Sequence, residues 1–254
     1  PQDNTEVRRY MLAHGLLAPN PHNRQPWIAD LRREGEITLV CDADRLLPET
    51  DPFGRQILIG CGGFIELAVM AAAERGYRVT VEPFPSGEQG PSELPGGRAV
   101  ARLVLVRDHS TPRDRLFAQI FRRHTNKSAY DPTKPVPASA LQLFGASARE
   151  MGLLSGDVVD APTIEKVRKI TRASFEIEMV TSRTWLESAR LLRIGPGEIE
   201  KHRDGSSVMG TMPRLLTTFG LLDRFDLPAP GNGMYKQVMD RFALQETGSG
   251  YFWI

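Results

Sequence analysis

Apolar residues recur along the chain with two different spacings. Helices are predicted where they recur every three or four residues, over residues 5–17, 137–152, 163–190 and 235–245. Strands are predicted where apolar and polar residues alternate or β-branched residues cluster, over residues 36–41, 77–84, 98–107 and 250–254. A nearly continuous apolar run over residues 56–75, followed by Gly76, predicts a central buried helix with a glycine at its C-terminal end.

The segment between the second and third predicted strands is rich in Pro, Gly, Ser and Glu, which is typical of a surface loop. We therefore expect these strands to pair antiparallel and to close a first unit of residues 1–108. A second unit, residues 109–254, is predicted to open with a helix over residues 113–121. Thr111 is the expected N-cap of this helix and Pro112 its first residue.

Residues 198–233 mix short apolar pieces with Gly and Pro, and the run Gly195-Pro196-Gly197 is expected to break the helix before them. Irregular segments of this length in compact proteins are often functional loops. The sequence therefore predicts a lid or a mobile loop here.

The stretch PNPHNRQPW, residues 19–27, combines prolines with amide side chains. Proline excludes the interior of a helix or a central strand, so the stretch predicts a stiff loop. Asn and Gln each carry a donor and an acceptor, which suits a flavin ring edged with alternating C=O and N–H groups. The alternative is an ordinary helix-to-strand connection whose amides bond to nearby backbone.

The run RRHTNK, residues 122–127, places four potentially cationic groups and a hydroxyl within six residues. Arginine forks match phosphate geometry, and threonine adds a short donor. This pattern predicts an anion cradle, with a solvated basic helix end as the alternative.

Composition narrows the class of protein. The chain has 254 residues, of which 41% are apolar and 25% charged, as in globular proteins that bury a substantial core. Its 32 basic and 31 acidic side chains leave a net charge of +1, so no electrostatic footprint points to nucleic acid or an anionic membrane. No membrane span is predicted, because Cys-Gly-Gly and Glu66 interrupt the longest apolar run.

Three further side chains have expected roles in packing. Cys41 and Cys61 lie in apolar settings, where reduced, buried thiols of a cytosolic protein are favoured over a disulfide between them. His14 lies beside an apolar helical stripe and is expected to be a packed helix histidine and not a ligand. The glycines after Cys61 allow close approach of another helix or of a ligand.

Taken together, two of these motifs resemble FMN-dependent nitroreductases. RRHTNKSAYDPTKPVP resembles the opening phosphate-binding motif of that family. PNPHNRQPW resembles the family loop that reaches the flavin of the opposite subunit in the usual homodimer. Each motif occurs once, in reversed order along one chain. With the stretch TDPFGRQILIGCGG and the RDG segment at Asp204, the pattern is similar to the Acg family of nitroreductase-like FMN-binding proteins.

The resemblance implies an α+β, nitroreductase-like fold of two tandem degenerate halves, each with a mostly antiparallel sheet and flanking helices. Residues 1–108 would carry the NxQPW flavin loop, and residues 109–254 the phosphate motif, with family elements missing beyond Ile254. Since each half supplies one motif, the resemblance implies a fused pseudo-dimer with one FMN site instead of two.

The implied cofactor site draws on both motifs. In the basic motif, Lys127 would lie near the N1/O2 edge of the flavin and stabilise its reduced form. In the loop, Asn20 stands where the family usually has Ser. No catalytic side chain and no metal site is implied. The residues expected to bind FMN are Pro19, Asn20, Pro21, Asn23, Gln25, Arg122, Arg123, His124, Thr125 and Lys127.

Two functions follow as expectations. The first is a cytoplasmic oxidoreductase that passes electrons from NAD(P)H through FMN to a nitroaromatic or quinone acceptor. The second is a non-catalytic FMN-binding or flavin-sequestering protein with a lidded single site. Either would be a monomeric pseudo-dimer or a homodimer, without nucleic-acid or membrane partners. A third interpretation is an unrelated α+β binding domain without flavin.

Overall fold

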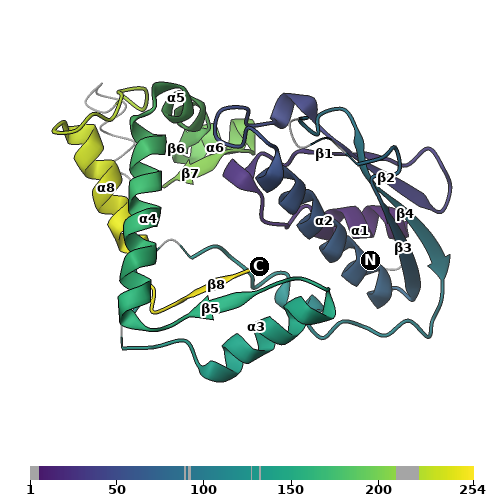
Figure 1. The fold of residues 1–254 in the computed structure, drawn as a ribbon. Helices are drawn as coiled ribbons and strands as arrows, with labels where there is room; N and C mark the ends of the chain where they lie inside the picture. Colours follow the sequence, from purple (N-terminus) through teal and green to yellow (C-terminus); the bar gives the residue numbers. More distant parts are fainter. Residues whose placement is uncertain (1–5, 89, 91–92, 127, 132, 210–222) are drawn as a thin grey trace. The chain divides into compact units, whose positions relative to one another are not determined.

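The computed structural model describes residues 6–88, 90, 93–126, 128–131, 133–209 and 223–254 (Figure 1). The chain divides into two compact units. Unit 1 comprises Pro1–Thr125 and Glu187–Arg224, and unit 2 comprises Asn126–Leu186 and Phe225–Ile254. Residues 109–125 therefore pack within unit 1, although the sequence analysis assigns them to the second half. The tandem relationship of two halves stays a prediction.

A four-stranded antiparallel sheet forms the centre of unit 1, in the order β1-β2-β4-β3. Its strands are β1 (Trp27–Asp30), β2 (Glu36–Cys41), β3 (Tyr77–Pro83) and β4 (Ala99–Arg107). Along β2, buried and half-buried residues alternate, because successive side chains point to opposite faces. The buried set is Ile37, Leu39 and Cys41.

Helices α1 (Val7–Gly15) and α2 (Arg55–Glu74) cover the buried face of this sheet (Figure 1). Ile57, Phe64 and Ala68 of α2 are fully or almost fully buried. The carboxylate of Asp51 accepts from the amide of Ile57 at 2.9 Å and satisfies a donor in the first turn of α2. By length and composition α2 could cross a membrane, but here it is the central core helix of unit 1.

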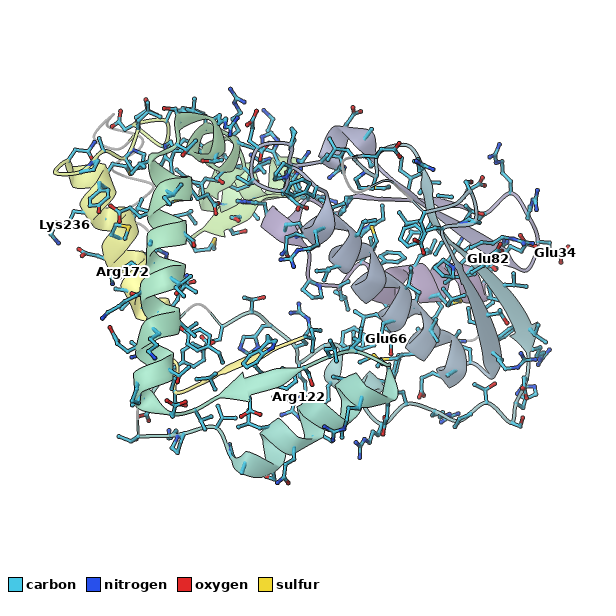
Figure 2. The ribbon with its side chains drawn as sticks, viewed as in Figure 1. Glu34, Glu66, Glu82, Arg122, Arg172 and Lys236 are labelled. Atoms are coloured by element: carbon cyan, nitrogen blue, oxygen red, sulfur yellow. The ribbon has the colours of Figure 1, made fainter. Side chains whose placement is uncertain are left out.

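The opposite face of the sheet is charged. On β4, the guanidinium of Arg102 donates to both oxygens of Glu36 on β2, at 2.6 and 2.8 Å. It also lies 3.3 Å from Glu82 of β3, which Figure 2 labels. This bidentate pair lowers the pKa of Glu36 through the hydrogen bond from Arg102.

A smaller element completes unit 1. Strand β6 (Leu192–Ile194) pairs in parallel with β7 (Ser206–Val208), and α6 (Gly195–His202) connects them. Along the chain, α5 (Ser182–Arg190) precedes β6 and contains the boundary between the two units, which falls after Leu186. Short 3-10 turns lie at Pro21–Asn23 (η1), Ala43–Arg45 (η2) and Phe117–Gln119 (η3).

Unit 2 contains the helices α3 (Ala138–Glu150), α4 (Ala161–Val180) and α8 (Gly233–Gln245). It also contains a two-stranded sheet of β5 (Gly156–Val158) and β8 (Tyr251–Trp253). Phe175 and Phe242 stack with centroids 4.0 Å apart, and Tyr235 donates to Glu176 at 2.6 Å, so α4 packs against α8. Strand β5 pairs antiparallel with β8, and Phe252 of β8 contacts Phe144 of α3.

Most predicted elements are confirmed within a few residues at their ends. These include the core helix, the antiparallel pair of β3 with β4, and the strand before Ile254. Gly76 follows α2 with a φ of 71°, a conformation that glycine adopts without strain. Cys41 and Cys61 are both buried and unbridged, as expected.

The predicted helix over residues 113–121 is wrong. Only the short turn η3 forms there, and the hydroxyl of Thr111, the expected N-cap, has no partner among the described residues. Two contacts compete with a helix. Asp114 accepts from the amide of Leu116 at 2.7 Å, and the rings of Phe117 and Phe121 pack on His14 of α1. His14 is therefore the packed histidine that the sequence predicts.

Two further expectations need correction. The helix predicted over residues 163–190 is two helices, because Thr181 adopts an extended backbone between α4 and α5. The run Gly195-Pro196-Gly197 does not end the preceding helix, because α5 already ends at Arg190; the run forms the first turn of α6, where proline is well tolerated. Of the predicted lid, α6 and β7 are regular structure. Residues 210–222 lie outside the described part of the chain, so the lid stays a prediction.

An ion pair in unit 1 predicts a pH dependence. Arg224 donates to Glu198 at 2.6 Å, and the amide of Ile194 donates to the same carboxylate at 2.8 Å. The hydrogen bond from Arg224 holds the pKa of Glu198 at about 2. Because the folded pKa is depressed, this stabilisation is complete above about pH 4.5 and is lost as the pH falls toward 2.

We therefore expect Glu198→Gln to flatten the decline in the free energy of unfolding below pH 4.5, as measured by urea denaturation at several pH values. The exposed neighbour offers a control, Glu200→Gln, which should follow the wild type. Equal acid sensitivity of all three proteins would contradict the assignment.

Candidate cofactor site

The loop of residues 19–27 has an unusual backbone. His22, Asn23 and Gln25 all have positive φ, at 47°, 50° and 49°. Each such residue costs about 1–3 kcal/mol and keeps this conformation only where its surroundings enforce it, although asparagine tolerates it better than most residues. The loop is therefore a conformation that other parts of unit 1 must hold in place.

Two local contacts shape the start of the loop. The side-chain oxygen of Asn20 accepts from the backbone amide of Gln25 at 2.7 Å, and its amide nitrogen donates to the carbonyl of Ala18 at 3.1 Å. Asn20 thus supports the loop itself, as the alternative interpretation of these amides expects. Its Cβ also lies against α2, where a Cβ at Gly60 would stand only 2.9 Å away. The sequence predicts a close approach at the glycines after Cys61, but the tight contact is at Gly60: a Cβ at Gly62 would meet nothing within 4 Å, and one at Gly63 would make only ordinary contacts.

The end of the loop is anchored in the hydrophobic core. Pro26 is fully buried, and the ring of Trp27 lies 4.9 Å from that of Phe64 on α2. From Trp27 onward the chain continues as β1. The Pro-Trp part of the motif therefore ties the loop to the sheet and to α2.

Arg24 joins the loop to distant parts of unit 1. Its guanidinium donates to Asp204 at 2.9 Å, to the carbonyl of Asp44 at 2.6 Å and to the carbonyl of Arg45 at 3.2 Å. Burial lowers the pKa of Arg24, and the charge of Asp204 opposes that shift. Sequence reasoning did not include Arg24 among the site residues. The sequence features that point to Arg24 are its position between Asn23 and Gln25 and the presence of the RDG segment, residues 203–205.

The basic segment lies beside the start of the loop. Arg123 donates through Nη2 to the carbonyl of Leu17 at 3.4 Å, two residues before Pro19. Arg122, Arg123, His124 and Thr125 are all exposed, and in the described ranges neither arginine forms an ion pair. Figure 2 labels Arg122 in this segment. Within unit 1, Arg123 of the basic segment therefore lies beside Leu17, two positions before the loop, although the two motifs are about a hundred residues apart in sequence.

Two amide side chains of the loop have hydrogen-bonding atoms that are not used within the described residues. Gln25 donates through Nε2 to the carbonyl of Arg203 at 3.0 Å and to Asn23 Oδ1 at 3.4 Å. Among the described residues, Gln25 Oε1 accepts no hydrogen bond and Asn23 Nδ2 donates none. Each of these two amides therefore keeps one hydrogen-bonding atom without a partner in that part of the chain, an acceptor on Gln25 and a donor on Asn23. Pro19 and Pro21 shape the backbone around them.

Lys127 lies outside the described residues, so its predicted place beside a flavin stays a prediction.

In unit 2, residues of α4 and α8 line a cavity of about 660 Å³ that includes Arg172, labelled in Figure 2. Arg172 is already paired with Glu246, and none of the predicted site residues lines this cavity.

Comparison with known proteins finds relatives whose names agree with the resemblance of the motifs. The chain is 30% identical over 151 residues to "Putative NAD(P)H nitroreductase Rv3131" of Mycobacterium tuberculosis, covering 59% of this chain and 42% of the relative. It is 35% identical over 82 residues to "Putative NAD(P)H nitroreductase acg" of the same organism, covering 32% of this chain and 24% of the relative. The resemblance to nitroreductase-like proteins that include Acg is confirmed.

The chain thus spans less than half the length of these curated relatives. A third similar protein, "Uncharacterized protein Rv3127" of M. tuberculosis, is 31% identical over 129 residues, which is 48% of this chain and 36% of the relative. No family model matches the chain.

The contact between the loop and α2 predicts a difference between two neighbouring glycines. In Gly60→Ala the new Cβ would press on Asn20, which costs about 1–3 kcal/mol of overpacking. In Gly62→Ala nothing lies within 4 Å of the new Cβ, so only the better helix propensity of alanine acts, by up to about 1 kcal/mol. Urea denaturation should therefore show Gly60→Ala to be destabilised and Gly62→Ala to be unchanged or stabilised. Equal stabilities would show that the loop does not pack on Gly60.

Proposed function

We propose that this chain forms the flavin-binding part of an FMN-dependent oxidoreductase of nitroreductase type. The observation that carries the proposal is that the basic segment lies beside the start of the amide-rich loop in unit 1, where Arg123 donates to the carbonyl of Leu17, two residues before Pro19. Similarity to proteins named as NAD(P)H nitroreductases supports an oxidoreductase role. In this proposal, electrons pass from NAD(P)H to a nitroaromatic or quinone acceptor.

Each motif has a separate task in this proposal. Arg122 and Arg123 bind the phosphate through charge-assisted hydrogen bonds, with Thr125 as a further donor. Asn23 and Gln25 orient the ring through the donor and acceptor that the loop leaves available. When bound, FMN supplies the hydride-accepting centre. The protein then needs to bind, orient and exclude water, and no side chain has to act as acid or base.

The remaining parts of the proposal concern assembly and location. One FMN per chain, a monomeric pseudo-dimer or a homodimer, and a cytoplasmic location are all proposed from the resemblance and the composition. The acceptor and the choice between NADH and NADPH are left to experiment.

Turnover is tested by anaerobic reduction. Protein reconstituted with FMN should lose its yellow absorbance when excess NADPH is added, and should regain it when a quinone is added. A protein that binds FMN tightly but is not bleached by NADPH or NADH would instead be the flavin-sequestering protein. A protein that stays colourless after reconstitution would contradict flavin binding altogether.

The phosphate role of Arg123 predicts a difference between two ligands. Arg123→Ala should weaken FMN binding by about 1.5–3 kcal/mol, the range for a hydrogen bond to a charged group. Riboflavin, which lacks the phosphate, should be affected much less. Both affinities can be measured by quenching of flavin fluorescence.

A matched control for this measurement is Arg113→Ala. Arg113 also belongs to unit 1 and precedes the basic segment in the chain, but its Nε lies 3.8 Å from the carboxylate of Glu74 on α2. It should leave both affinities unchanged. Equal weakening of FMN and riboflavin by Arg123→Ala would show that Arg123 holds structure and not phosphate.

A further inference from the structure

Asp204 is the point where three arginines of unit 1 converge. Arg24 of the loop lies 2.9 Å from Oδ2, Arg45 of η2 lies 3.9 Å from the same oxygen, and Arg193 of β6 lies 2.7 Å from Oδ1. The side chains of Asp204, Arg24 and Arg193 are only 11%, 13% and 10% exposed. A carboxylate this buried and this fully bonded is costly to lose, because its partners would remain buried without compensation.

The backbone around Asp204 also contacts the loop directly. The amide of Gly205 donates to the carbonyl of Asn23 at 3.3 Å, and the carbonyl of Arg203 accepts from Gln25 Nε2 at 3.0 Å. Gly205 has a φ of 81°, and a Cβ there would lie 2.3 Å from the carbonyl of Leu191. Only glycine fits this turn. The RDG segment is therefore shaped to meet the loop at three successive residues.

These contacts fall where the loop is under strain. Asn23 and Gln25 are two of its positive-φ residues, and Arg24 lies between them. Strained backbone of this kind persists only when surrounding structure enforces it. The local hydrogen bonds of Asn20 fix one end of the loop, and the RDG segment, about 180 residues later in the chain, fixes the middle.

We propose that Asp204 is a positioning residue that holds the loop of residues 19–27 in the conformation that binds the flavin ring. The inference rests on the proposed function, since it names what prepares the loop for its ligand. Asp204 does not touch the ligand. It acts through Arg24, whose position between Asn23 and Gln25 sets the directions of the two amides that remain available.

The variant that tests this role is Asp204→Asn, which keeps the size of the side chain and removes its charge. Because the loop is expected to meet the ring, FMN and riboflavin should weaken by the same factor, about tenfold, which corresponds to about 1.4 kcal/mol. The absorption spectrum of the bound flavin should also shift toward that of free flavin. In the protein without ligand, the amides of residues 23–25 should exchange with deuterium about tenfold faster, while β2 and β4 stay unchanged.

The matched control is Glu36→Gln, which removes a carboxylate that accepts two hydrogen bonds from Arg102 on the charged face of the sheet. It should change neither affinity nor the exchange of the loop. If Asp204→Asn fails to fold, Arg24→Lys takes its place, because lysine keeps the charge but cannot reproduce the three bonds of the guanidinium. The same expectations apply to it.

The outcomes separate this inference from the proposed function. Unchanged affinities with a loop that exchanges at the wild-type rate would overturn the positioning role, and so would weakening confined to FMN. If the wild type binds neither flavin, the proposed function fails. The exchange measurement on the unliganded protein then still decides whether Asp204 holds the loop.

Discussion

Burial of helix α2 is the constraint on which the rest of unit 1 depends. Its apolar residues contribute to both hydrophobic clusters, one with Leu39 and Trp27, the other with Met11 and Leu103. A helix that is apolar on most sides needs cover from more than a sheet. α1 and the segment before the loop supply that cover, and the small residue Gly60 lets the chain approach closely. The same burial that stabilises unit 1 therefore places the loop.

Ion pairs hold the part of the loop that hydrophobic packing does not reach. The loop is anchored by Pro26 and Trp27 in the core, but its middle is polar and strained, and apolar burial cannot hold it. Asp204 and Arg24 provide directional bonds at that point, at little exposure to water. The arrangement leaves the side chains of Asn23 and Gln25 only partly used, which is the state that a ligand-binding loop requires.

The assignment of the two motifs to the units is relevant to the hypothesis of two tandem halves. The loop, the basic residues 122–125 and the RDG segment all belong to unit 1. Residues 122–125 of the proposed phosphate motif therefore lie in the same unit as the first motif, although the sequence analysis assigns them to the second half. This is compatible with two complementary motifs that serve one site, while the relationship between the halves rests on the resemblance alone.

The sequence by itself determined the elements whose patterns are local: strands β2, β3 and β4, the core helix ended before Gly76, and the two motifs of the candidate site. These follow from side-chain periodicity and from backbone preferences within a few residues. Tertiary structure decided the rest. Phe117 and Phe121 pack on His14 instead of forming a helix, and Asn20 supports the loop instead of standing free. The bond between Arg24 and Asp204 joins residues 180 positions apart, and no local pattern encodes such a pairing, because it exists only once the chain has folded.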